Sequence, residues 1–363
     1  MGLDACHAKT KFGGVFLVMT ILDGNGQVYP AALGIAEAEN NENWTWFLSM
    51  VKAALHIDDD NGGAGITFLS DREKGIEHAV QTVLPNSTQG FCVFHIRKNV
   101  KTRFKGGAEK LLSKAAKAAT EDAFRETLNQ ITLLNPAAGE YVVNIDPAKW
   151  ARAFFPSVRF GHITSNISES MNWWIDEARK RDPVGAFESY VLKLNGLFER
   201  RRDEYNAMRE DALPPKIAKR LTKSIEQGRR LRVKRHTANV FSVQRLNDPT
   251  LARVVDLSAP MCSRGHYDEF GIPCRHMSAA ALVKGEHPKK FVVKQLRLET
   301  VKATYQGFIM PVDMTTVGSD GLVPPVWRKR PGRPKTKRIK SSAEKVSRGR
   351  PARPKRGGRE SIS

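Results

Sequence analysis

The first hundred residues alternate short apolar runs with amphipathic segments. Strands are predicted over Val15–Leu22, Val28–Ile35, Ile66–Leu69 and Gly90–Phe94. Helices are predicted over Trp44–Leu55 with Asn43 as the cap, near Lys74–Val83, and from His95 to about Phe104. The first two strands are joined by Asp23-Gly24-Asn25-Gly26, whose turn chemistry makes them antiparallel. We therefore expect an α/β fold with a mixed sheet.

The rest of the chain changes character several times. Helical periodicity runs from Ala108 to about Arg209, and a highly charged helical connector is predicted at 210–239. Alternation returns over Val240–Leu257, which leads into a cluster of Cys and His. From 317 to 363 Gly, Pro, Ser and basic residues dominate, which predicts disorder. The predicted organisation is a core at 1–209 with a helical insertion at about 108–165, the connector, a cysteine-containing region at 240–310, and a basic tail.

Composition excludes several classes of protein. Hydrophobic residues make up 40% of the 363, enough for a core, which argues against a disordered or fibrous chain. The apolar runs are far shorter than the roughly 20 residues of a membrane span, so no membrane partner is expected. The N-terminal residues have no apolar segment before a cleavage site, so no secretory signal is expected. Four cysteines cannot form a disulfide scaffold, which favours reduced thiols or a metal site.

Positive charge is concentrated at the C-terminus. The chain carries a net charge of +21, and residues 328–363 hold 15 Lys or Arg against two Glu, so this stretch alone contributes +13. Such a tail predicts a polyanionic partner, most simply double-stranded DNA. A nuclear-import or solubilising tail is the alternative.

Two aspartates lie where strands deliver polar groups to a common crevice. Asp71 follows the apolar strand Ile66–Leu69, and Asp4 closes a first strand of which only Met1–Leu3 is present. Two carboxylates on neighbouring strands would suit a hard divalent cation such as Mg²⁺. Alternatively, Asp71 caps the helix that follows it.

Several motifs in the expected order resemble the transposase domain of Mutator-like elements (MULEs). They are LDACHAKTKFGG, FLSDREKGIEHAV, GFCVFHIRKN and TSNISESMNWWI, and the resemblance extends from about Gly2 to Lys335. It implies an RNase H-like fold with a large helical insertion and a DDE triad that uses Mg²⁺ or Mn²⁺. Asp4 and Asp71 match the two catalytic aspartates, and Glu169 matches the third acid. Other acids in the helical region remain as alternatives for that third position: Glu121, Glu126 and Glu140.

The resemblance also covers a C-x-x-H element, which here is Cys92 and His95. A thiol and an imidazole at this spacing can share a metal or a hydrogen bond. A buried Cys beside a helix-capping His is the structural alternative. Basic residues of the following helix could track a DNA backbone or only face solvent: Arg97, Lys98, Lys101, Arg103 and Lys105.

The segment MCSRGHYDEFGIPCRHM, residues 261–277, resembles a SWIM zinc finger, whose pattern is C-x-C followed by C-x-H. Cys262, Cys274 and His276 match the pattern, whereas Arg264 stands where its second cysteine should be. Arginine does not ligate zinc because its guanidinium stays protonated. His266 is the nearest replacement for the fourth ligand of a structural Zn²⁺. A degenerate finger that folds without metal is the alternative.

The tail contains two Gly-Arg-Pro cores that resemble AT-hooks, within 330–335 and 348–351. Glycine allows close approach to DNA, and arginines can enter a narrow A·T-rich minor groove. The expected DNA contacts are Arg330, Arg333, Lys335, Arg348 and Arg350.

Together these features predict a DNA transposase, or a truncated or domesticated derivative, that cuts and joins DNA by two-metal chemistry in the nucleus. The alternative is a transposase-derived transcriptional regulator without enzymatic activity. The three acids favour the enzyme, and the nearly absent first strand favours the regulator. A generic zinc-dependent interaction module would leave the acids unexplained. Homo-oligomer formation is left open.

Overall fold

The computed structural model describes residues 1–313 except 11, 73, 105, 165 and 312; the side chains at 74, 166–169 and 248–251 are also outside the description. The basic tail, with its five predicted DNA-contacting residues, therefore lies outside the described residues. Among the described helices, none is both long enough and apolar enough to cross a membrane.

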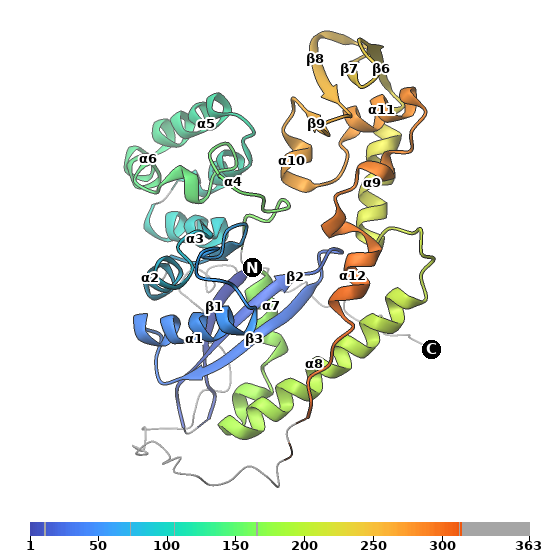
Figure 1. Ribbon diagram of the computed structural model, residues 1–363. Coiled ribbons are helices and arrows are strands. Elements are labelled where there is room, and N and C mark those ends of the chain that lie inside the picture. The colour runs from blue at the N-terminus through green and yellow to red at the C-terminus, as the bar shows by residue number, and fades with distance from the viewer. Residues whose placement is uncertain (11, 73, 105, 165, 312, 314–363) are drawn as a thin grey trace, which may run out of the picture.

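A five-stranded mixed sheet forms the centre of the N-terminal part (Figure 1). Its strands are β1 (Gly2–His7), β2 (Val15–Leu22), β3 (Val28–Ala36), β4 (Thr67–Ser70) and β5 (Thr88–Phe91), in the order β3-β2-β1-β4-β5. The first three strands pair antiparallel, and β4 and β5 run parallel to β1. This mixed α/β architecture is RNase H-like and confirms the predicted fold.

The first strand is longer than expected. β1 spans six residues and pairs with β2 along its whole length, from Gly2 opposite Thr20 to His7 opposite Val15. The expectation of a nearly absent first strand, with Asp4 at its end, was therefore wrong. The polar side chains of Asp4, Cys6 and His7 hid the strand in the sequence, because a strand beside a polar site loses its apolar signal.

Helices cover both faces of the sheet. Helices α1 (Asn41–Ala54) and α2 (Lys74–Val83) enclose a core with Leu17 and Met19 of β2. The opposite face, with Phe16 and Val18, packs against the helices α7 (Asn166–Trp174), α8 (Pro183–Asn206) and α12 (Leu298–Thr304). β2 is thus buried on both sides, which explains its continuous apolar run.

Two local boundaries differ from the prediction. The cap of α1 is Asn40, whose side chain accepts a hydrogen bond from the Asn43 backbone amide, so the helix begins three residues earlier than predicted. The strand predicted over Gly90–Phe94 ends at Phe91, and α3 (Val93–Arg103) begins directly after Cys92.

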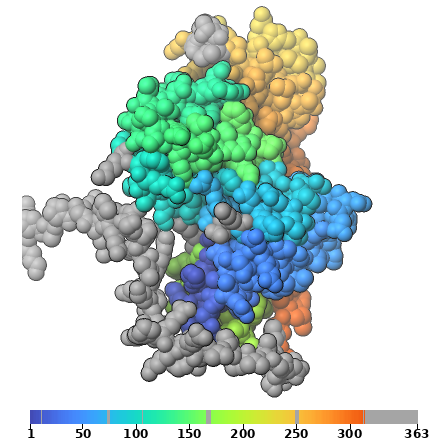
Figure 2. Space-filling view, turned by 90° about the vertical axis from the view of Figure 1, so that its left-hand side faces the viewer, coloured from blue at the N-terminus to red at the C-terminus, as the bar shows by residue number. Residues whose placement is uncertain are grey.

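The helical insertion packs around its own core. It comprises α4 (Ala108–Lys117), α5 (Glu121–Leu134), α6 (Pro136–Val143) and the short helix η1 (Pro147–Lys149), and shares that core with α3. Figure 2 shows these helices above the sheet domain and in front of the C-terminal residues. The chain then returns to the sheet through α7 (Asn166–Trp174), η2 (Ala178–Lys180) and the long α8 (Pro183–Asn206).

A smaller C-terminal module follows α9 (Pro215–Gly228). Its antiparallel sheet has the order β6-β7-β8-β9, from β6 (Leu231–Arg235), β7 (Val240–Arg245), β8 (Asp248–Asp256) and β9 (Met261–Cys262). We use "C-terminal module" for this sheet with α10 (His266–Phe270) and α11 (Arg275–Lys284). The segment predicted as a helical connector therefore ends in a strand. The chain returns toward the first sheet through η3 (Pro288–Phe291), η4 (Lys294–Leu296) and α12 (Leu298–Thr304) (Figure 1).

The turn between β2 and β3 is buried under this returning segment. The Asp23 side chain is fully buried and accepts hydrogen bonds from the hydroxyls of Tyr205 and Tyr305, at 3.2 and 2.9 Å. A Cβ on Gly24 would lie 2.5 Å from the carbonyl oxygen of Gln295, so the turn requires glycine for close approach. The hairpin tip is thus a contact between the sheet and the C-terminal helices.

Candidate active site and Cys/His cluster

The two predicted aspartates lie at the same edge of the sheet. β1 and β4 are parallel neighbours with Gly2 in register with Leu69, and Asp4 and Asp71 each lie two residues further on. β5 ends beside them, since the Cys92 amide donates a 2.7 Å hydrogen bond to the Ser70 carbonyl oxygen. The parallel strands thus deliver Asp4, Asp71 and the Cys92–His95 element to one place.

Burial and a neighbouring carboxylate alter the acidity of Asp4. Burial, first, and then the nearby Asp71 carboxylate raise the pKa of Asp4 to about 6, against hydrogen bonds from Asn172 and from the Ala5 amide that lower it. Two carboxylates held together away from water repel each other until a proton or a cation neutralises them.

The helix that carries Glu169 is packed on the strand that carries Asp4. The Asn172 Nδ2 donates a 2.8 Å hydrogen bond to Asp4 Oδ2, and the buried Met171 packs beside Phe16 and Val18 of β2. Glu169 occupies the same helix three residues before Asn172, and i,i+3 positions share a helix face. The Glu169 side chain lies outside the described residues, so its place in the triad stays a prediction.

The alternative third acids belong to the insertion. Glu121 and Glu126 lie on α5, where they bind Arg125 and Gln130 of the same helix, and Glu140 lies on α6. Both helices pack within the insertion core rather than on β1. Their placement favours Glu169 for the third position.

Cys92 and His95 interact with each other and with the carboxylates. A hydrogen bond with Cys92 is the main cause that raises the pKa of His95, and the charges of Asp71 and Asp4 raise it further. The His95 Nδ1 is buried without a hydrogen-bond partner among the described residues. The C-x-x-H element is thus part of the carboxylate site rather than a separate feature.

A comparison of the sequence with models of known protein families agrees with these features. Residues 1–99 match the family model described as the MULE transposase domain. This segment is a MULE transposase domain. The match covers β1 to β5 and the start of α3, and thus both aspartates and the Cys92–His95 element. No curated protein matches the chain.

A second group of ligating side chains lies in the C-terminal module, beyond the MULE transposase domain. Cys262, Cys274 and His276 are buried, and their ligand atoms all lie within 4.8 Å of one another. The His276 Nδ1 is 3.7 Å from the Cys262 Sγ and 3.8 Å from the Cys274 Sγ. Tetrahedral Zn²⁺ places sulfur and nitrogen ligands about 3.6 Å apart, given the usual bond lengths. The three donors therefore fit zinc in type and spacing.

His266 is not a member of this three-residue group. It begins α10 and stacks on Phe270, with ring centroids 4.4 Å apart. Burial lowers its pKa to about 4, so the ring is neutral and able to ligate, and its Nδ1 is buried without a partner among the described residues. The assignment of His266 as the fourth ligand stays a prediction.

The sequence did not identify Trp173 and Asn172 as candidate residues of the site. Trp173 follows Asn172 on α7 and its side chain is 80% exposed, whereas its neighbour Trp174 packs against Tyr190. Trp173 lies four residues after Glu169, and residues at this spacing share one face of a helix, so the sequence did contain a signal for Trp173. An exposed indole on the helix that carries Asn172 offers a surface on which a nucleobase can stack.

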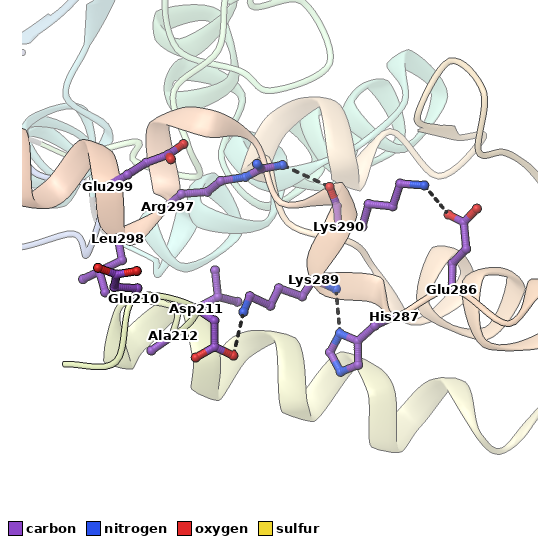
Figure 3. Close-up of a pocket in the computed structure, with 11 residues that line it drawn as sticks. Glu210, Asp211, Ala212, Glu286, His287, Lys289, Lys290, Arg297, Leu298 and Glu299 are labelled. Carbon is purple, nitrogen blue, oxygen red and sulfur yellow. Dashed lines mark hydrogen bonds and ion pairs between the residues drawn. The ribbon is translucent and has the colours of Figure 1, made fainter.

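A groove of about 730 Å³ lies apart from both sites, between the start of α9 and the segment η3–α12 (Figure 3). The lysines that line this groove form ion pairs with acidic residues of the same groove. The Lys289 Nζ lies 3.5 Å from Asp211, and the Lys290 Nζ lies 3.3 Å from Glu286. A groove whose charges are paired in this way has little net attraction for a polyanion.

Proposed function

We propose that the protein is a DNA transposase that cuts and joins DNA strands with Asp4, Asp71 and Glu169 as its catalytic carboxylates. The observation that carries this proposal is the convergence of Asp4 and Asp71 at one sheet edge within a MULE transposase domain. The raised pKa of Asp4 supports it, because a metal-binding carboxylate pair should repel itself in the absence of cations.

The three acids would hold Mg²⁺ or Mn²⁺. Oxygen donors suit these hard ions. A cation bound there would neutralise the negative charges of the buried Asp4 and the neighbouring Asp71. When bound, paired metals polarise the scissile phosphate and increase the nucleophilicity of the attacking water or 3′-hydroxyl.

The protein's own groups would orient this centre. Asn172 fixes one oxygen of Asp4 through its hydrogen bond, leaving less freedom for the carboxylate to rotate. His95, with its Cys92 partner, places a protonatable ring beside the carboxylates, where it can donate to a phosphate oxygen. The exposed Trp173 would contact a base of the bound strand.

We further propose that Zn²⁺ binds Cys262, Cys274 and His276 with His266 as the fourth ligand. Its role would be structural, because three of these residues are buried in the core of the C-terminal module. The module and the basic tail would hold double-stranded DNA, and the tail would enter A·T-rich minor grooves. The proposed location is the nucleus.

The alternative of a non-enzymatic regulator loses one of its arguments. It rested on a nearly absent first strand, whereas β1 is fully paired with β2. An intact strand keeps Asp4 in register with the rest of the site, which favours the enzyme.

Nicking of supercoiled plasmid by the full chain, with and without Mg²⁺ or Mn²⁺, tests the proposal. We expect metal-dependent nicking that Asp71→Asn abolishes and Asp60→Asn, an exposed residue of the same domain, leaves intact. A wild-type chain that binds duplex DNA but never nicks it would support the regulator instead. Equal nicking by wild type and Asp71→Asn would refute the assigned site.

A further inference from the structure

Two arginines meet where β8 and β9 end their pairing. Val255 is opposite Cys262, and the Ser263 amide donates a 2.9 Å hydrogen bond to the carbonyl oxygen of Val254. Arg264 follows in the turn closed by the 2.8 Å hydrogen bond from the Gly265 amide to the Cys262 carbonyl oxygen, and Arg253 directly precedes Val254 on β8. The residue at the unmatched finger position therefore lies in the turn that leaves β9, at the same end of the β8–β9 pairing as Arg253.

Two further arginines join them. Arg275 begins α11 between Cys274 and His276, and Arg245 ends β7, the strand paired with β8. The pKa of Arg275 is lowered, mainly by partial burial and then by the charges of Arg264, Arg245 and Arg253. Since α11 packs against β7 and β8, and Cys262 lies beside Cys274, these four arginines lie at one end of the module, and we call them the arginine patch.

No ion pair joins this patch to any carboxylate among the described side chains. Three arginines outside the module behave differently. Arg152 forms an ion pair with the largely buried Glu269, whose carboxyl also feels the charges of Arg159 and Arg220. Arg152 thus joins the insertion to the module, and it also donates to the Gly265 carbonyl oxygen at 2.9 Å. Within the arginine patch, the Arg275 Nε donates a 3.3 Å hydrogen bond to the His276 Nε2, whereas Arg245, Arg253 and Arg264 form no ion pair with the described side chains.

Gathering four like charges costs free energy that a bound anion would recover. Arg245 and Arg264 are exposed, and Arg253 and Arg275 are half-buried, so the patch is open to solvent. Guanidinium groups bind phosphate oxygens in a bidentate way.

We propose that the arginine patch, formed by Arg245, Arg253, Arg264 and Arg275, binds the phosphodiester backbone of duplex DNA. Arg264 then binds a phosphate at the position where the finger pattern has a metal ligand. The choice of DNA as the anion rests on the proposed function, but the site requires neither cleavage nor the carboxylates.

The test compares two pairs of substitutions in the full chain, each removing two positive charges from the C-terminal module. Arg253→Gln/Arg264→Gln alters the patch. Arg232→Gln/Lys234→Gln is the control, because both residues are exposed on β6, at the opposite edge of the sheet from β9. Duplex binding is followed by fluorescence anisotropy at several chloride concentrations, without divalent cations so that no cutting occurs.

We expect the patch pair to weaken binding and to reduce the slope of log K against log salt by about 1.8, at about 0.9 for each phosphate that the protein no longer neutralises. The control pair should change the slope far less. Equal effects of the two pairs, or no effect of either, would overturn the proposal. Zinc content and melting temperature, measured on each variant, separate weaker DNA binding from impaired folding.

Inorganic phosphate distinguishes a backbone site from a free-anion site. At equal ionic strength, phosphate should displace DNA no better than sulfate and should not raise the melting temperature in a patch-dependent manner. A patch-dependent stabilisation by phosphate alone would overturn the assignment to DNA. Failure of the patch leaves the plasmid-nicking test unaffected, whereas a chain that binds but cannot nick leaves the patch standing.

Discussion

Asn172 donates a 2.8 Å hydrogen bond to the carboxylate of Asp4 across 168 residues of sequence. The bond ties α7 to β1 and so joins the motif around Glu169 to the first aspartate. It also opposes the burial that raises the pKa of Asp4. Asn172 is therefore a positioning residue for the carboxylate centre.

Asn172→Ala should raise the pKa of Asp4 above its present value of about 6, because the charged form no longer accepts the stabilising hydrogen bond. The acidic limb of the pH profile for Mg²⁺-dependent nicking should then move to higher pH. Asn195→Ala on α8, whose side chain bonds the Ile309 backbone, is the matched control and should leave the profile unchanged. An unshifted profile for Asn172→Ala would mean that the bond does not act on Asp4.

The acidity of Asp4 predicts how stability depends on pH in the absence of divalent ions. A carboxyl with a pKa of about 6 in the folded state binds its proton more tightly there than in the unfolded state, where its pKa has the ordinary value of 3.8. The free energy of unfolding should therefore fall as pH rises from about 4 to about 6, and then level off. The decrease is on the order of 3 kcal/mol at most, from a pKa difference of about two.

Asp4→Asn removes that titration, so it should flatten the profile and be the more stable protein at pH 7. Urea denaturation at a series of pH values measures both effects, with Asp60→Asn as the exposed control. Mg²⁺ should stabilise the wild type and not Asp4→Asn. A wild-type stability that rises between pH 4 and 6 relative to Asp4→Asn would contradict the assignment.

The buried Asp23 should make the hairpin tip sensitive to removal of its tyrosine donors. Tyr305→Phe removes a 2.9 Å hydrogen bond to a fully buried carboxylate, so we expect a decrease of about 1–3 kcal/mol in the free energy of unfolding. Tyr29→Phe is the matched control, since Tyr29 packs on Tyr305 with ring centroids 5.8 Å apart but lies outside the Asp23 network. Chemical denaturation that finds the two variants equal would show that the hydroxyl of Tyr305 contributes nothing.

We expect the purified chain to contain about one Zn²⁺, measured by elemental analysis. Cys274→Ser should remove it, and Cys6→Ser, a cysteine of β1 outside the cluster, should not. Zinc affinity should weaken below neutral pH because the ligands must be deprotonated. A metal-free wild type at neutral pH would leave a degenerate finger, and full zinc retention in His266→Ala would assign the fourth position to water or another side chain.

Removal of residues 326–363 deletes 15 of the 59 basic residues and both Gly-Arg-Pro cores. Binding to all duplexes should weaken and become less salt-dependent, by about 0.9 in slope for each phosphate that the tail had neutralised. A preference for A·T-rich over G·C-rich duplexes should disappear as well, because arginine insertion depends on groove width. If the full chain shows no A·T preference in such titrations, the tail acts only as a charge carrier or import signal.

The sequence by itself determined the elements with strong periodicity and the identity of the strand-end acids. The apolar run of β2, the turn at 23–26 and the Lys74–Val83 helix carry local signals that need no knowledge of distant residues. The paired aspartates and the Cys92–His95 element were recognisable because their motifs are short and contiguous. Three of the four proposed zinc ligands, Cys262, Cys274 and His276, were also recognisable from a motif, because Cys274 and His276 lie only two positions apart.

Only the tertiary structure decided how these pieces meet. β1 was invisible to periodicity because Asp4 and its polar neighbours replace the apolar pattern, and its pairing with β2 had to show it. The hydrogen bond from Asn172, the burial of Asp23 and the gathering of four arginines all join residues far apart in the chain. Local sequence encodes which face of an element is buried. The partner of a polar side chain depends instead on how whole elements pack against one another. That packing sets the acidity of Asp4 and brings together the charges of the arginine patch.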